Sequence, residues 1–223
     1  MRQERSLQPQ GFTLLEILVS MSIFLLIFLG IYEVFDSSHA TYARGVRRVD
    51  VQQNARFAME EMAKRIRLTG YFSESFDADP GNDLVNPVAI QLATDTALAI
   101  YGDLDNSGPP SRVFLFCLNP DPTPPRSVFR KRSLSGDANA LTCSTLGTTA
   151  DDITLAENVT DLRFTYFDAD SNLIPTAPPT YALTAAQRLT VRMVVIRLVA
   201  TETNPGQLTQ QYTLTSSIRA RNL

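Results

Sequence analysis

An apolar segment near the start of the chain constrains the fold more than any other feature. Phe12 to Tyr32 covers 21 residues, and no charged side chain occurs between Ile17 and Tyr32. As an α-helix this segment would be roughly 31 Å long, close to the hydrocarbon thickness of a bilayer, about 30 Å. A chain of 223 residues therefore has room for one membrane helix and one globular head.

One carboxylate, that of Glu16, lies inside this apolar segment. An acidic side chain in a membrane helix costs roughly 2.5–3.5 kcal/mol on insertion scales, so it usually has a function and a partner. Two arginines, Arg2 and Arg5, precede the segment and predict a cytoplasmic N-terminus. No small-residue cleavage site follows the segment, but Gly11 precedes it. Cleavage there would give Phe12 a free amine about one helical turn from Glu16. The alternative is a plain signal anchor, in which Glu16 reaches the membrane interface.

Residues 11–20, Gly-Phe-Thr-Leu-Leu-Glu-Ile-Leu-Val-Ser, resemble the cleavage and methylation motif of type IV prepilins and type II secretion pseudopilins. The resemblance implies that a prepilin peptidase cuts after Gly11 and methylates the new N-terminus at Phe12. It also implies that Glu16 attracts the N-terminal charge of the adjacent subunit and sets the register of assembly through this salt bridge.

The helix is predicted to continue past the membrane, because no proline occurs between Pro9 and Pro80. Apolar side chains recur there at steps of three and four residues, as one helix face requires: Ala55, Ala58, Met59, Met62, Ala63 and Ile66. Gly70 suits the end of this helix. We expect a leader at 1–11, a transmembrane and assembly helix at 12–35, an amphipathic half at 36–70 and a β-rich head at 71–223.

The head has the alternating pattern of β-strands, interrupted by proline and glycine. The predicted strands are 88–92, 97–101, 112–118, 127–133, 161–167, 188–200 and 210–219. Both faces of 188–200 are largely apolar, which places it inside the sheet. The expected fold is α+β: a long N-terminal hydrophobic helix packed on a mainly antiparallel sheet, as in pilins.

Three further segments, 62–71, 158–166 and 217–223, resemble minor pilins of the PilW type and the related J-type pseudopilins. The resemblance implies a place in the complex that initiates or primes type IV pilus assembly, at or near the tip. The implied partners are other minor pilins, the major pilin and the inner-membrane assembly platform. The implied location is the bacterial inner membrane, as a single-pass protein with a periplasmic head, and then the pilus fibre at the cell surface.

The two cysteines, Cys117 and Cys143, are the expected disulfide of an exported head, with two unpaired buried thiols as the alternative. Two cysteines and a lone histidine, His39, do not make a zinc site. Asp103, Asp105 and Ser107 match the start of a calcium loop, but a turn between strands explains the same residues. The expectation is therefore no cofactor, with calcium as the alternative.

The lone histidine, His39, lies in the predicted helix and not in the head. A serine or cysteine triad in the head would need a histidine base there, so no catalytic residue and no enzyme activity is expected. The net charge of −3 argues against a general nucleic-acid binder. One basic run, Arg126, Arg130, Lys131 and Arg132, could contact phosphate, or could be a solvated strand edge.

The sequence thus favours a minor pilin. A minor pseudopilin of a type II secretion system is the first alternative, and a tip adhesin or DNA-binding subunit is the second.

Overall fold

The computed structural model describes residues 12–71, 89–102, 112–119, 126–134, 143, 152–176, 181–202 and 210–223. Within the strands, the side chains at 112, 129 and 131–134 lie outside this description. The chain divides into two compact units, residues 1–46 and 47–223. A single helix, α1 (Leu14–Leu68, 55 residues), runs from the first unit into the second.

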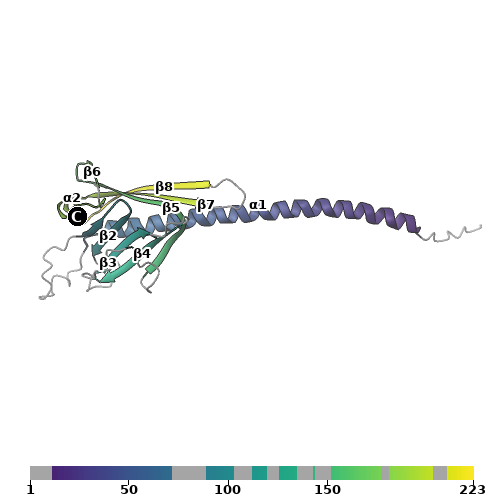
Figure 1. Ribbon diagram of the computed structural model, residues 1–223, viewed down its shortest axis with the longest axis horizontal. Helices are drawn as coiled ribbons and strands as arrows, with labels where there is room; N and C mark the ends of the chain where they lie inside the picture. The colour runs from purple at the N-terminus through teal and green to yellow at the C-terminus, as the bar shows by residue number, and fades with distance from the viewer. Residues whose placement is uncertain are drawn as a thin grey trace, which may run out of the picture. The chain divides into compact units, whose positions relative to one another are not determined.

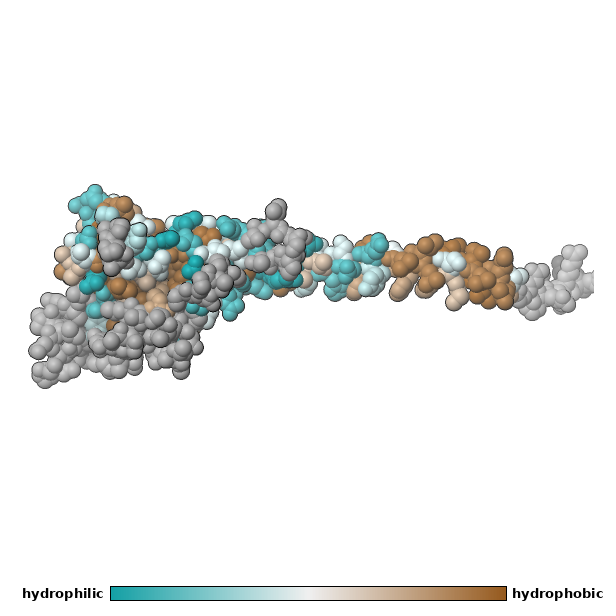
Figure 2. Space-filling view, in the orientation of Figure 1, coloured by the Kyte–Doolittle hydropathy of each residue, from teal (hydrophilic) through white to brown (hydrophobic). Residues whose placement is uncertain are grey.

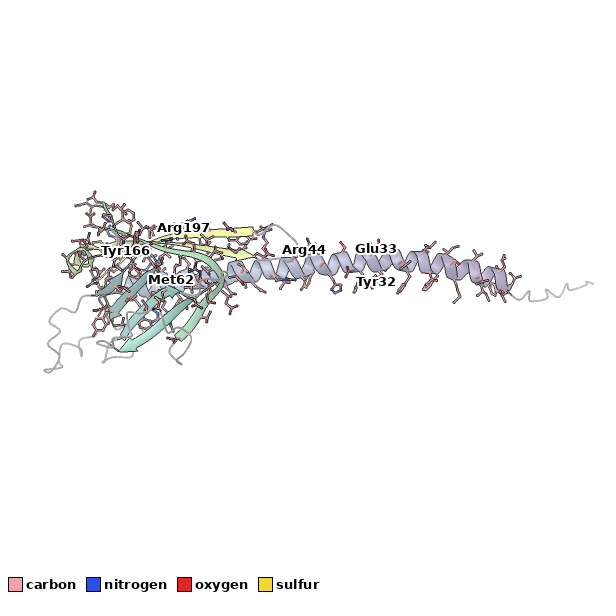
Figure 3. The ribbon with its side chains drawn as sticks, in the orientation of Figure 1. Tyr32, Glu33, Arg44, Met62, Tyr166 and Arg197 are labelled. Atoms are coloured by element: carbon pink, nitrogen blue, oxygen red, sulfur yellow. A yellow bond between two sulfur atoms is a disulfide. The ribbon has the colours of Figure 1, made fainter. Side chains whose placement is uncertain are left out.

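In the first unit, α1 carries an exposed apolar surface. Between Leu14 and Phe35 every large apolar side chain is more than half exposed, from 51% at Val19 to 78% at Leu14. This helix is long and apolar enough to cross a membrane, and none of its most apolar window is buried. Figure 2 shows the apolar stretch as a continuous brown surface that gives way to polar side chains. Tyr32 and Glu33 lie on this exposed part of the helix, and Arg44, further along, is half-buried (Figure 3).

In the second unit, the end of α1 packs on the β-sheet. Its buried residues are Val51, Ala55, Ala58, Met59, Met62, Ala63 and Ile66. These are the positions at which the sequence places the apolar stripe, extended by one turn to Val51. Small side chains at three of the seven sites allow the helix to approach the strands closely.

Gly70, two residues after the last residue of α1, has a φ of +78° and stops the helix. The Tyr71 amide donates to the Leu68 carbonyl at 2.9 Å, and the Gly70 amide donates to the Tyr101 carbonyl at 3.2 Å. Glycine is favoured here because side chains strain the left-handed conformation. A Cβ on Gly70 would also lie 2.8 Å from the Asn222 carbonyl oxygen.

One antiparallel sheet forms the rest of the described head and curls around the end of α1 (Figure 1). Its strands are β1 (Ile90–Ala93), β2 (Ala97–Gly102), β3 (Arg112–Leu118), β4 (Arg126–Leu134), β5 (Asp152–Phe167), β6 (Leu173–Ile174), β7 (Met193–Glu202) and β8 (Gln210–Arg219). The order is β1-β2-β3-β4-β5-β7-β8, and β6 pairs with β5. A short helix, α2 (Ala185–Thr190), precedes β7.

The main core lies between α1 and the inner face of the sheet. Met62 and Tyr166 point into it (Figure 3), and both are fully buried. The Tyr166 hydroxyl donates to the Thr94 carbonyl at 2.6 Å. Burial raises the pKa of Tyr166 well above its ordinary value, and the charge of Asp95 adds to the effect. The phenol therefore stays protonated and keeps β5 tied to the turn after β1.

A second apolar cluster lies on the opposite face of β2 and β3. Its buried members are Ala97, Ala99, Tyr101, Val113, Leu115 and Cys117, and Cys143 packs against it. They alternate with Leu98, Ile100, Phe114 and Phe116 of the main core, as the two faces of a strand require. Both faces of this hairpin are therefore buried.

The structure confirms the α+β class and an antiparallel sheet on a long helix. The expected strand at 188–200 is wrong in its first residues, because 188–190 belong to α2. Thr184 and Gln187 form a capping box there, which starts a helical turn before the strand. The strand β7 itself lies between β5 and β8, inside the sheet as expected.

Candidate functional site: the N-terminal assembly motif

The first turn of α1 is organised by Thr13. The Glu16 amide lies 3.3 Å from the Thr13 hydroxyl and 3.1 Å from its carbonyl, so Thr13 is the N-cap. Thr13 and Glu16 have the spacing of a capping box, in which the glutamate would return a bond to the N-cap amide. Within the described part of the chain only the threonine half is formed.

Glu16 therefore presents an unused carboxylate in an apolar helix. Its neighbours Leu15 and Ile17 are 73% and 52% exposed, and Glu16 is exposed as well. Its position in the first turn is electrostatically favourable, since the helix N-terminus carries partial positive charge. Across the described residues its carboxylate accepts no hydrogen bond and makes no ion pair.

Phe12 lies immediately before the cap and is 82% exposed. Gly11 and the rest of the expected leader lie outside the described residues, so the geometry of the cleavage site is not described. Phe12 and Glu16 are thus held at one end of a helix whose following turns are mostly apolar and uncharged as far as Tyr32. An amine created at Phe12 and the Glu16 carboxylate would both be accessible to a second chain.

The charged residues of the head form a different arrangement. Glu61 on α1 accepts from Arg65 at 2.9 Å and from Arg130 of β4. All three are mostly buried, at 14% exposure of each side chain. Arg65 and Arg130 also lie 5.2 and 5.4 Å from the ring centre of Phe114. This cluster ties the helix to β3 and β4, which makes it a structural element.

Burial raises the pKa of Glu61, but the hydrogen bonds and charges of Arg65 and Arg130 outweigh burial. The pKa of this carboxyl is therefore below its ordinary value, and Glu61 is ionised at neutral pH. Arg65 is the partner expected from helical spacing. Arg130, 69 residues further along the chain, comes from the tertiary fold.

The basic run in β4 is therefore not a strand edge, because β4 lies between β3 and β5. Arg130 forms an ion pair with Glu61. Arg126 is half-buried, and the side chains of Lys131 and Arg132 lie outside the described residues.

The structure joins Cys117 of β3 to Cys143 in a disulfide, with 6.3 Å between their Cα atoms. The expected calcium-loop residues Asp103, Asp105 and Ser107 lie outside the described residues. The ranges that are described hold no group of three or more histidine, cysteine, aspartate or glutamate residues placed for a metal ion.

Sequence reasoning missed an exposed ion-pair ladder on the outer face of β5 and β7. Asp161 accepts from Arg163 at 3.0 Å and from Arg197 at 2.9 Å, and Arg163 also pairs with Asp95. The register of β5 against β7, which places Arg163 opposite Arg197, creates this ladder. The alternation of Arg163 and Thr165 with apolar residues marks the outer face, but the pairing across strands requires the register.

Comparison with known proteins identifies the N-terminal site. The model of the prokaryotic N-terminal methylation motif matches residues 8–32, which contain Phe12 and Glu16. A search of the curated proteins finds no match to the chain. The motif supports a prepilin-type protein that is anchored in a membrane and is a substrate of a prepilin peptidase. Such proteins are the type IV pilins and the type II secretion pseudopilins, which assemble into pilus-like fibres.

Proposed function

We propose that this chain is a minor pilin that takes part in initiating type IV pilus assembly, at or near the tip of the fibre. The observation that carries the proposal is the Glu16 carboxylate, which has no partner among the described residues and lies four positions after Phe12 within the matched motif. Cleavage after Gly11 and methylation of Phe12 are part of the proposal. The minor and initiating role is supported by the resemblance of residues 62–71, 158–166 and 217–223 to minor pilins of the PilW type.

The physical driving force for assembly is the charge pair. Lipid tails and helix surfaces are equally apolar, so moving α1 from the bilayer into a fibre gains little hydrophobic free energy. An unpaired carboxylate in the membrane is costly, however, and a neighbouring N-terminal amine removes this cost. Glu16 therefore favours the packed helices over the isolated one.

The same motif fits a minor pseudopilin of a type II secretion system, which is the second candidate. A pilin and a pseudopilin differ in the process that is lost when the chain is absent. Deletion of its gene should abolish surface pili in the first case, and export of folded proteins across the outer membrane in the second. Restoration by the wild-type gene is the control in both assays.

The test of processing is mass spectrometry of the chain purified from membranes and from sheared fibres. We expect a mature N-terminus at Phe12 that carries one methyl group. The Gly11→Ala variant should accumulate at full length in the membrane, with its head intact. A functional chain that retains Met1 would contradict the proposal.

A further inference from the structure

The two edge strands of the sheet, β1 and β8, differ in how they are protected from pairing with another strand. At one edge, β1 has four residues, and its register shifts between Ile90 and Leu92. The segment before α2 covers it, because the Leu183 amide donates to the Ala93 carbonyl at 2.8 Å. A short, irregular and covered strand is the usual protection against edge-to-edge pairing.

The other edge, β8, has none of these protections among the residues that the structure describes. It has ten residues and pairs with β7 without a register shift from Met193↔Arg219 to Glu202↔Gln210. It contains no proline and no lysine, and its outward side chains include Thr213, Thr215 and Ser217. Within the described residues its backbone hydrogen bonds run only to the β7 side. A long, regular strand with unpaired amides and carbonyls is a template for another strand.

This edge runs along the helix axis within the second unit. The Arg48 guanidinium lies 5.6 Å from the centre of the Tyr212 ring, at the start of β8. At the other end, the Arg221 amide lies 3.4 Å from the Arg67 carbonyl. β8 therefore runs in the same direction as the part of α1 that belongs to the second unit.

Charge indicates the kind of strand that fits. Arg219 and Arg221 at the end of the edge are both exposed, and neither makes an ion pair within the described residues. Arg197, which lies opposite Thr215 of β8, is already paired with Asp161. An added strand would therefore meet uncompensated positive charge at one end and uncharged Thr and Ser along its length.

We propose that the free edge of β8 accepts an extended strand from the head of an adjacent fibre subunit of a different sequence, whose acidic side chains pair with Arg219 and Arg221. This proposal rests on the function proposed above. Main-chain hydrogen bonds would supply affinity, and the two arginines would select the register. The association would thus join heads as well as membrane helices.

The first experiment is hydrogen–deuterium exchange of the full chain in sheared fibres and in detergent micelles. We expect about half of the β8 amides, those that alternate toward the free edge, to exchange at least tenfold more slowly in fibres, while β1 changes little. If the chain is present in fibres but its β8 amides exchange equally fast in both states, strand addition is overturned and the proposed function is not. Absence of the chain from fibres would overturn the proposed function as well. The same protection in concentrated micelles of the purified chain would identify a second copy as the occupant and overturn an adjacent subunit of another kind.

The second experiment uses two neighbouring proline variants, Thr215→Pro and Ser216→Pro. Alternate amides face β7 and the free edge, so one variant loses a β7 bond and the other loses only an outward donor. Melting temperature distinguishes them, and the variant that keeps its stability should be depleted from fibres at least tenfold. Its incorporation at the wild-type level would overturn the proposal. If both variants unfold, the double variant Arg219→Glu, Arg221→Glu provides the test, since normal incorporation of it would exclude an acidic partner strand.

Discussion

Glu16 is the residue on which the proposed assembly depends most. It lies in the first turn of a helix whose surroundings are apolar, and its own capping box is only half formed. A carboxylate that is not used locally is free for an intermolecular partner. The sequence motif alone identified Glu16, because the chemistry of this site is local in the chain.

Replacement of Glu16 by Ala should leave membrane insertion intact and reduce incorporation into fibres by about tenfold or more. A charge-assisted bond is worth about 1.5–3 kcal/mol, and 1.4 kcal/mol corresponds to about tenfold. Glu33→Ala, which removes an exposed acid further along the same helix, is the matched control. Quantitative immunoblots of sheared fibres and membranes measure both. Wild-type incorporation of the Glu16 variant would refute the pairing role.

Glu61→Gln should destabilise the head by about 1–3 kcal/mol, because it removes the charge that two mostly buried arginines share. Denaturant unfolding measures this loss. The Glu60→Gln variant, one position away on an exposed part of α1, should change little.

The same carboxylate predicts a pH dependence. The folded-state pKa of Glu61 lies below its ordinary value of 4.5, so its contribution is present above about pH 4.5. The contribution is lost as the pH falls through the lowered pKa and Glu61 binds a proton. The wild-type melting temperature should therefore fall in this acidic range more steeply than that of Glu61→Gln. Parallel curves would contradict the assignment.

At the scale of helices and strands, the sequence predicted most of the elements that have a regular apolar pattern. The helix and the strands β3 and β8 follow from helical spacing and from alternation, and their bounds differ from the expectation by two residues at most. The first half of β5 was missed, since register shifts against both of its neighbours interrupt its alternation. Asn158 lies in this stretch with a φ of +58°. The pairing of Glu61 with Arg130 could not be predicted, because it depends on which face of β4 meets the helix.

The end of α1 gives a prediction at this scale. Gly70→Ala should cost about 1–3 kcal/mol, since alanine is strained at a φ of +78° and its Cβ would contact the Asn222 carbonyl oxygen. Gly45→Ala is the control, because a Cβ there meets nothing within 4 Å. That helix-interior change should be neutral or slightly stabilising. Thermal unfolding of the two variants would decide, and equal melting temperatures would refute the steric argument.

At the scale of the whole head, a disulfide joins two separate parts of the chain. Cys117 is buried in the second apolar cluster, and Cys143 lies 26 residues further along. Removing a bond that closes such a loop costs about 2–4 kcal/mol. The Cys143→Ala variant should therefore unfold at lower denaturant concentration than the wild type and should no longer respond to reductant. An unchanged midpoint in both tests would mean that the bond adds no stability.

The parallel course of α1 and β8 also determines how the head bears mechanical load. Tension along the helix axis acts on all seven buried α1 side chains at the same time, and it shears their contacts instead of peeling them one by one. Shear requires many contacts to break together, whereas peeling breaks them in succession. A head built in this way resists extraction of its helix when α1 is pulled along its axis.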